Sequence, residues 1–155
     1  MIYLIGSLRN PHIPGIGNAL RDEGYDVFDD WYAAGDKADD AWQFYEQKKG
    51  LTYREALTRR AARHTFEFDL KHLTQASVVV LVTPAGRSGY LELGWALGRD
   101  KKGYVLLDQT QERWDLMLCL ATGVYDTLDQ LLQVLQENEW RGYVTNSNRL
   151  DNTSD

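Results

Sequence analysis

The sequence predicts a single α/β domain, in which a five-stranded parallel sheet carries helices on both faces. The chain has 155 residues, which suits one such domain. Short apolar runs alternate with segments of helical pattern, as in folds built from parallel strands and crossover helices. Residues 77–82 (SVVVLV) are β-branched and continuously apolar, which is typical of a central parallel strand buried on both faces.

Each predicted strand is a short apolar run that ends at a glycine or at polar residues. The strands are expected at residues 1–5 (MIYLI), 25–28 (YDVF), 77–82, 103–107 (GYVLL) and 123–125 (GVY).

Helical patterns fill the segments between these strands. Gly24 and Gly50 end two of them, and Thr52 with Glu55 forms a capping box that opens the longest. That segment, 53–75, contains no glycine or proline and is predicted to be one helix. The helices are expected at 16–23, 39–49, 53–75, 86–98, 112–121 and 127–137. The domain is expected to span residues 1–138, with a polar, loosely held tail over 139–155.

The composition argues against several classes of function. A net charge of −6 disfavours a nucleic-acid polymer as partner, because such a partner requires a basic surface. No apolar run reaches the roughly 18 residues of a membrane span and no signal peptide precedes Met1, so no membrane partner is expected. The single cysteine, Cys119, cannot form an intrachain disulfide, which fits a reducing cytoplasm. His12, His64 and His72 lack the spacing of metal ligands.

The binding site is expected at the carboxyl ends of the strands, because parallel α/β sheets bind ligands there, at the point where the strand order reverses. Three loops converge at this edge, namely those after Ile5, Phe28 and Val82.

The first loop, GSLRN, suits an anion such as phosphate. Gly6, Ser7 and Arg9 supply a flexible backbone, a hydroxyl and a cation beside several backbone N–H groups. An ordinary turn with a solvated arginine is the alternative interpretation. The loop lacks the Gly-Lys-Ser/Thr of a P-loop, so ATP hydrolysis is not expected.

The second loop begins with Asp29, Asp30 and Trp31. Two acids and an indole at a strand end suit a sugar hydroxyl and a base, but they can equally well cap the loop.

Glu92 is the only acid in the segment GRSGYLELGWALG, residues 86–98. With Ser88 as N-cap, Glu92 lies in or just past the first turn, where it can simply complement the helix dipole. Its apolar neighbours indicate a buried face, however, and a buried carboxylate is costly unless it is paired or used. This favours a functional role. Asp69, on the long helix, is in isolation more simply interpreted as a surface acid.

Three blocks of the chain resemble the nucleoside 2-deoxyribosyltransferase family and its hydrolytic relatives, the 2′-deoxynucleoside 5′-phosphate N-hydrolases. They are IYLIGSLR (2–9), FEFDLKHLTQASVVVLV (66–82) and SGYLELGWALGRDKKGYVLL (88–107). The resemblance extends over residues 1–137 in order and spacing, and it implies a Rossmann/flavodoxin-like fold.

The resemblance implies that Glu92 is a nucleophile, that Tyr3 lies beside it, and that Asp69 contacts the substrate. The implied reaction cleaves the N-glycosidic bond of a nucleoside or its 5′-monophosphate and transfers the sugar to another base or to water, without metal or cofactor. A homo-oligomer, dimer or larger, is also implied. The residues expected to bind the substrate are Gly6, Ser7, Arg9, Asp30, Trp31, Gly86 and Ser88.

Gly86 departs from the pattern of both subfamilies. Six residues before the nucleophile the transferases tend to carry an aspartate and the hydrolases a serine, whereas this chain has Gly86 followed by Arg87 and Ser88. The segment 31–65 is also longer than expected. Transferase or hydrolase, and nucleoside or nucleotide, therefore stay open. A nucleotide sensor without catalysis and a hydrolase of another N-glycoside such as NAD are the alternatives.

Overall fold

The computed structural model describes residues 1–147 and contains one five-stranded sheet, as predicted. The strands are β1 (Ile2–Ile5), β2 (Val27–Phe28), β3 (Val78–Val82), β4 (Lys102–Leu106) and β5 (Gly123–Tyr125). Their order is β2-β1-β3-β4-β5, and all neighbouring pairs are parallel. After β2 the chain crosses back to the other side of β1, so the strand order reverses between β1 and β3.

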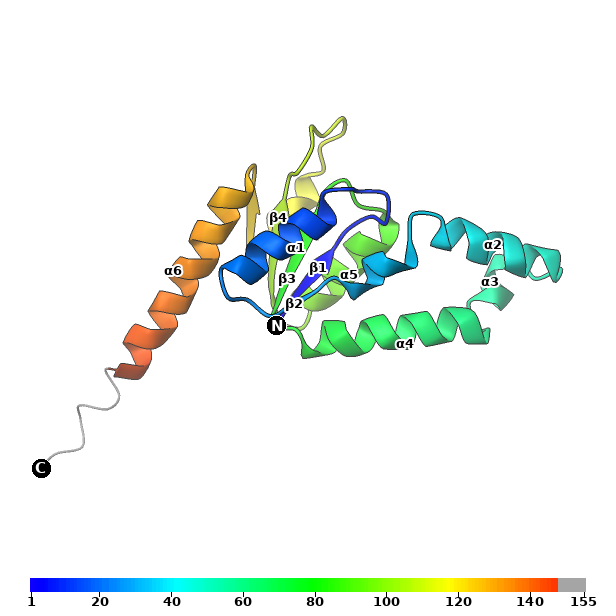
Figure 1. Cartoon of the computed structure of the whole chain (residues 1–155), viewed down its shortest axis with the longest axis horizontal. Coiled ribbons are helices and arrows are strands. Elements are labelled where there is room, and N and C mark those ends of the chain that lie inside the picture. Colours follow the sequence, from blue (N-terminus) through cyan, green and yellow to red (C-terminus); the bar gives the residue numbers. More distant parts are fainter. Residues whose placement is uncertain (148–155) are drawn as a thin grey trace, which may run out of the picture.

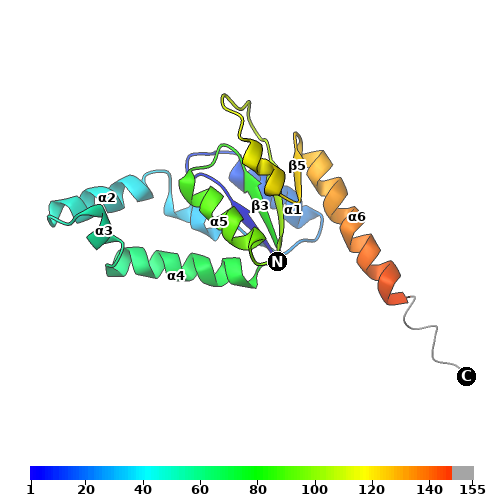
Figure 2. The same ribbon diagram turned by 180° about the vertical axis from the view of Figure 1, so that it is seen from behind.

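Helices cover both faces of the sheet (Figure 1, and from behind in Figure 2). Helices α1 and α6 pack on the face to which Leu4 points, and α4 and α5 pack on the opposite face, to which Tyr3 and Ile5 point. The helices are α1 (Ile13–Asp22), α2 (Ala38–Lys48), α3 (Tyr53–Ala56), α4 (Arg60–Gln75), α5 (Arg87–Leu97) and α6 (Leu128–Ser147), with 3₁₀ helices η1 (Asp30–Ala34) and η2 (Leu116–Leu120). Not one of the helices within residues 1–147 is both long and apolar enough to cross a membrane.

Helices α2, α3 and α4 form an arm that extends away from the sheet (Figure 1). Helix α2 leads outward, α3 lies at the tip, and α4 returns to the start of β3. This arm contains most of the unexpectedly long segment 31–65.

The predicted single helix over 53–75 is wrong. The capping box of Thr52 and Glu55 is present, but it opens only the short helix α3. Arg59 then adopts an extended conformation and becomes the N-cap of α4. The chain has to turn at the tip of the arm to bring α4 back to the sheet, and this long-range requirement interrupts a segment without helix breakers.

Other boundaries differ by less. Helix α1 begins at Ile13, earlier than the predicted residue 16, because proline is favoured in the first turn of a helix and Pro14 lies there. The predicted helix 112–121 is reduced to η2, where the Asp115 carboxylate accepts a hydrogen bond from the Met117 N–H. Helix α6 continues to Ser147, past its expected end at 137 and into the predicted tail; residues 148–155 of that tail lie outside the described part of the chain.

Candidate active site

A cleft of about 180 Å³ opens at the carboxyl ends of the strands, between the loops that follow β1, β2 and β3. The three loops therefore meet as predicted. The expected residues that line the cleft are Gly6, Ser7, Arg9, Trp31, Gly86 and Ser88. Leu8, Asp36, Asp39 and Gly89 also line it. These four residues were not predicted from the sequence, although Asp36 and Asp39 follow the same strand as Trp31.

Local hydrogen bonds fix the loop after β1. The Ser7 hydroxyl accepts from the Arg9 N–H at 3.1 Å, and the Ser7 carbonyl accepts from the Asn10 N–H at 3.0 Å. A Cβ on Gly6 would lie 2.6 Å from Ile13 Cδ1, so a side chain here would displace the end of the buried Ile13 side chain where α1 approaches this turn. The loop is therefore pre-organised, and its first residues face the cleft.

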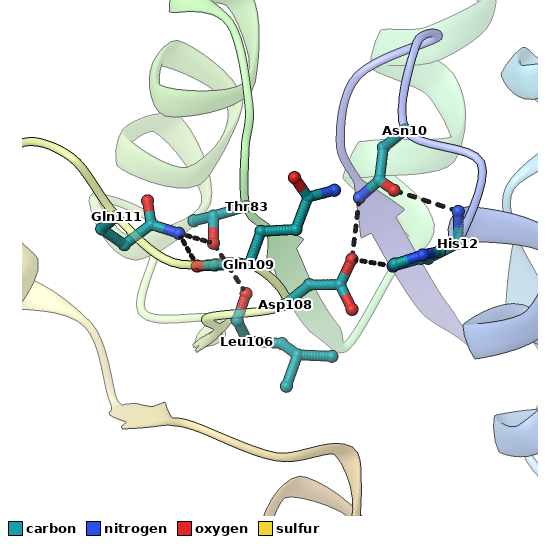
Figure 3. Close-up of polar contacts among 7 residues, drawn as sticks. All are labelled: Asn10, His12, Thr83, Leu106, Asp108, Gln109 and Gln111. Atoms are coloured by element: carbon teal, nitrogen blue, oxygen red, sulfur yellow. Dashed lines mark hydrogen bonds and ion pairs between the residues drawn. The ribbon is translucent and has the colours of Figure 1, made fainter.

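A polar cluster anchors the far end of the same loop (Figure 3). The Asp108 carboxylate, just after β4, accepts a hydrogen bond from the Asn10 amide at 3.2 Å and contacts His12 Nδ1 at 2.7 Å. Asn10 is 2% exposed, and its side-chain oxygen accepts from the His12 N–H. The sequence offered one signal for this cluster, an acid directly after a predicted strand.

Arg9 does not lie free in the cleft. Its guanidinium donates to the Asp40 carboxylate at 2.8 Å, and both side chains are about two-thirds exposed. An ion pair this exposed contributes at most about 1 kcal/mol. Arg9 can therefore exchange Asp40 for a bound anion at little cost.

Of the two neighbouring residues predicted to bind the substrate, Trp31 lines the cleft and Asp30 does not. The Trp31 indole N–H donates to the Leu4 carbonyl at 2.8 Å, which holds the ring against the end of β1 beside Gly6. Asp30, the first residue of η1, is exposed, and it is not among the described residues that line the cleft. The preceding acid, Asp29, is bound by the guanidinium of Arg21.

Helix α5 brings Glu92 over the sheet. Its N-cap is Gly86, which has no side-chain cap, so the prediction of Ser88 as N-cap is wrong and Glu92 lies in the second turn. The dipole interpretation of Glu92 loses its basis, because that effect fades beyond the first turn. A Cβ on Gly89 would lie 3.0 Å from Ile5 Cγ2, so this glycine allows α5 to approach β1 closely.

Tyr3, Asp69 and Glu92 come together from β1, α4 and α5. The Tyr3 hydroxyl donates a hydrogen bond to the Glu92 carboxylate, and Asp69 lies close enough to interact electrostatically with both. Tyr3 is 1% exposed. Its ring lies 5.0 Å from the ring of Phe28, which in turn stacks on His72 at 4.0 Å. These rings make the environment of the two carboxylates largely apolar.

The pKa values in this cluster follow from burial and mutual repulsion. Burial, and secondarily the charge of Asp69, raises the pKa of Glu92 to about 7, against the lowering effect of the Tyr3 hydrogen bond. Burial also raises the pKa of Asp69, opposed by His72. The pKa of Tyr3 is raised by burial and by both carboxylates, so the phenol keeps its proton and acts as a donor. Such shifted carboxyl pairs are typical of acid–base and nucleophilic sites.

Tyr3→Phe is expected to shift the pH dependence of any reaction that requires ionised Glu92. Loss of the hydrogen bond that stabilises the carboxylate raises the pKa of Glu92, so the rising limb of kcat/KM moves upward, by about one pH unit. Tyr104→Phe is the matched control, since Tyr104 is equally buried and its hydroxyl accepts a hydrogen bond from the Asn138 amide. A limb that stays in place in the Tyr3 variant would contradict the coupling.

The part of the chain described, residues 1–147, brings no three His, Cys, Asp or Glu side chains close enough to hold a metal ion. The side chains at the site supply a partly buried carboxylate, a phenolic donor and a second carboxyl beside the cleft.

No protein-family model matches the chain, and no curated protein matches it. Among solved structures, the fold is similar to that of a 2-deoxyribosyltransferase from the psychrotolerant bacterium Bacillus psychrosaccharolyticus, with a TM-score of 0.56 and 19% sequence identity. The similarity covers 84% of this chain and 88% of that chain. At this identity it establishes a common Rossmann-like α/β fold, and the activity has to be argued from the site.

Proposed function

We propose that this protein cleaves the N-glycosidic bond of a 2′-deoxynucleoside or its 5′-monophosphate and passes the sugar to a second base or to water. One observation carries the proposal: Tyr3, Asp69 and Glu92 lie together, with Glu92 one helical turn from the cleft residue Gly89. The fold it shares with a 2-deoxyribosyltransferase supports the same class of reaction.

In the proposed first step, the ionised Glu92 carboxylate attacks C1′ of the sugar. The C1′–N bond breaks as an ester bond to Glu92 forms, and the departing base takes up a proton. Positive charge develops at C1′ in the transition state, and the carboxylate in its apolar surroundings stabilises that charge strongly. Tyr3 orients the carboxylate by donating its hydroxyl proton in a hydrogen bond.

Asp69 is proposed to deliver the proton to the base or to hold the sugar. Because its pKa is raised, Asp69 keeps a proton to higher pH than an exposed aspartate and so has one to deliver. In the second step, water or another base attacks C1′, the ester bond breaks, and Glu92 returns as a carboxylate. Trp31, held against β1 at the rim of the cleft, offers a flat surface on which a base can stack.

The direct test is incubation of the protein with a panel of 2′-deoxynucleosides and their 5′-monophosphates, with and without a second free base. Release of free base detected by chromatography supports the proposal, and appearance of a new nucleoside identifies a transferase. NAD is included in the panel as the alternative N-glycoside. Tight binding of a nucleotide without release of base would instead support a sensor domain.

Arg9→Ala is expected to lower kcat/KM selectively for a 5′-monophosphate. Hydrogen bonds from a guanidinium to a charged phosphate contribute about 1.5–3 kcal/mol, so we expect a loss of roughly tenfold or more, with little effect on the nucleoside. The matched control is Arg99→Ala, because Arg99 lies over the Trp95 ring beyond the opposite end of α5.

Substitution of Asp40, the ion-pair partner of Arg9, is expected to have the opposite effect on the preference for the monophosphate. Asp40→Asn frees Arg9 and removes one negative charge near the cleft, so the preference for the monophosphate is expected to increase a few-fold. An unchanged ratio of the two substrates in both variants would mean that Arg9 contacts no phosphate, and would favour a nucleoside substrate.

A further inference from the structure

The segment that follows β4, residues 107–111 (LDQTQ), lies at the edge of the sheet where the cleft opens, and we call it the strap. The Leu107 N–H fixes its start to β5 through a hydrogen bond to the Tyr125 carbonyl at 2.8 Å. The strap residues are not among the described residues that line the cleft. Any effect of the strap on a bound ligand therefore has to pass through other residues.

Asn10 connects the strap to the loop after β1 (Figure 3). Its amide nitrogen donates to the Asp108 carboxylate at 3.2 Å, and its side-chain oxygen accepts from the His12 N–H at 3.0 Å. Its backbone N–H donates to the Ser7 carbonyl at 3.0 Å. Asn10 is 2% exposed, and a polar side chain this buried needs hydrogen-bond partners. Asp108 thus holds Asn10, and Asn10 holds the turn that begins at Ser7.

The negative charge of Asp108 also lies at the start of α1. The N-cap of α1 is His12, and within residues 1–147 no side chain makes a cap bond there, nor does the first turn of α1 contain an acid. Asp108 comes from beyond β4 and places its carboxylate 2.7 Å from His12 Nδ1. A carboxylate near a helix N-terminus is favourable. The strap therefore supplies an acid that the sequence of α1 itself lacks.

Gln111 connects the other end of the strap to the loop after β3. Its amide nitrogen donates to the Thr83 hydroxyl at 2.8 Å and also to the Gln109 carbonyl. Thr83 is buried, and its hydroxyl donates to the Leu106 carbonyl at 3.3 Å. Thr83 begins the short loop that ends at Gly86, the N-cap of α5. The strap is therefore bonded to two of the three loops between which the cleft lies.

We propose that the strap is a positioning element of the candidate active site, in which Asp108 sets the loop after β1 and Gln111 sets the loop after β3. The inference rests on the proposed function, because it gives both residues a part in that reaction without contact with the substrate. The loop after β1 presents Ser7 and Arg9 to the cleft, and the loop after β3 leads into α5, which carries Glu92. Each end of the strap thus acts on a different part of the reaction.

The two ends are therefore expected to affect different kinetic constants. A displaced loop after β1 binds the substrate more weakly, so a defect at Asp108 or Asn10 raises KM more than it lowers kcat. A displaced loop after β3 moves α5 and with it the Glu92 carboxylate, so a defect at Gln111 lowers kcat more than it raises KM. A loss of folded protein alone lowers the apparent kcat and leaves KM unchanged, which distinguishes positioning from a merely structural role.

The main test exchanges the two partners of the bond between Asn10 and Asp108. Asn10→Asp places two carboxylates opposite each other, whereas Asn10→Asp/Asp108→Asn restores an amide opposite a carboxylate, with the direction of the bond reversed. The carboxylate introduced at position 10 still accepts from the His12 N–H, and the amide introduced at position 108 can donate to His12 Nδ1. The double variant therefore keeps every partner that the single variant loses.

Gln111→Met tests the other end, because methionine keeps the length of the side chain and removes the hydrogen bond to Thr83. Gln109→Ala is the matched control, since Gln109 is exposed on the same strap and accepts the Gln111 bond through its backbone carbonyl. Circular dichroism verifies folding. Asp108→Ala, which removes the partner of Asn10 without adding a charge, replaces Asn10→Asp if that variant fails to fold.

Hydrogen–deuterium exchange of the free protein measures the loop directly and requires no turnover. In Asn10→Asp, the N–H groups of Asn10 and His12 are expected to exchange roughly tenfold faster or more, because the bonds that hold the loop are lost. The double variant is expected to return to within about threefold of the wild type. With the substrate that the panel identifies, KM is expected to follow the same order, and Gln111→Met is expected to lower kcat several-fold.

The proposal is overturned if Asn10→Asp exchanges like the wild type, or if the double variant is no better than the single variant. It is also overturned if the strap variants change kcat and KM no more than Gln109→Ala does. A wild type without turnover contradicts the proposed function instead, and the exchange pattern then still decides whether the strap holds the loop after β1.

Discussion

Glu92→Gln is expected to abolish turnover while making the folded protein more stable above neutral pH. Glutamine keeps the shape of the side chain and can still accept the Tyr3 hydrogen bond, but its amide cannot form the ester at C1′. Loss of a nucleophile lowers the rate by on the order of 10³-fold or more.

The gain in stability follows from the raised pKa of Glu92. In the folded protein this pKa is about 7, against an ordinary value of 4.5. The folded state therefore binds the Glu92 proton more tightly than the unfolded state does. The stabilisation that this proton provides is fully present below pH 4.5 and is lost as the pH rises through about 7. Above that pH the ionised, partly buried carboxylate destabilises the fold by about 3 kcal/mol, a cost that glutamine does not carry.

The measurement is chemical denaturation of wild type and variant on both sides of this range. The two proteins are expected to have similar free energies of unfolding near pH 4.5, and the variant is expected to be the more stable at about pH 8. Glu67→Gln is the control, because Glu67 is exposed on α4 and forms an exposed ion pair with Arg63. Full turnover in the Glu92 variant, or a loss of stability at both pH values, would contradict the assigned role.

The features that the sequence predicted correctly depend on local pattern. The apolar run 77–82 is typical of a strand buried on both faces, and Val78–Val82 forms the central strand β3. Strand ends mark the edge where a parallel sheet binds ligands, so the loops that form the cleft followed from the strand positions alone. The apolar neighbours of Glu92 predicted a buried face, and Glu92 is indeed partly buried on α5, whereas its role stays a prediction.

The features that the sequence did not predict depend on contacts between distant residues. Arg59 extends because the chain must turn back toward the sheet, a requirement that no residue near it reveals. Gly86 takes the N-cap position from Ser88, although serine is a frequent helix cap. The pairing of Arg9 with Asp40 and the anchoring of Asn10 by Asp108 join segments 31 and 98 residues apart. Only the path of the chain in space determines which charges meet.

Asp69→Asn is expected to have the second largest effect, which depends on the leaving group. If Asp69 protonates the departing base, its loss lowers the rate of the first step by roughly 10²–10⁴-fold for a poorly leaving base. A base that leaves readily without a proton should be affected least. The loss should also exceed that in the second step, in which the ester to Glu92 is hydrolysed or transferred, as burst kinetics can separate.

Asp69→Asn is expected to have a second effect, which arises because the substitution removes the negative charge of Asp69. Asp69 raises the pKa of Glu92, so the neutral asparagine is expected to lower it and to move the rising limb of kcat/KM to lower pH. Glu67→Gln on the same helix again serves as the control, since its pair with Arg63 is exposed. Equal losses on good and poor leaving groups, together with a shifted limb, would leave Asp69 only a positioning and electrostatic role. An unshifted limb would contradict its proximity to Glu92, because two carboxylates that share an apolar site cannot ionise independently.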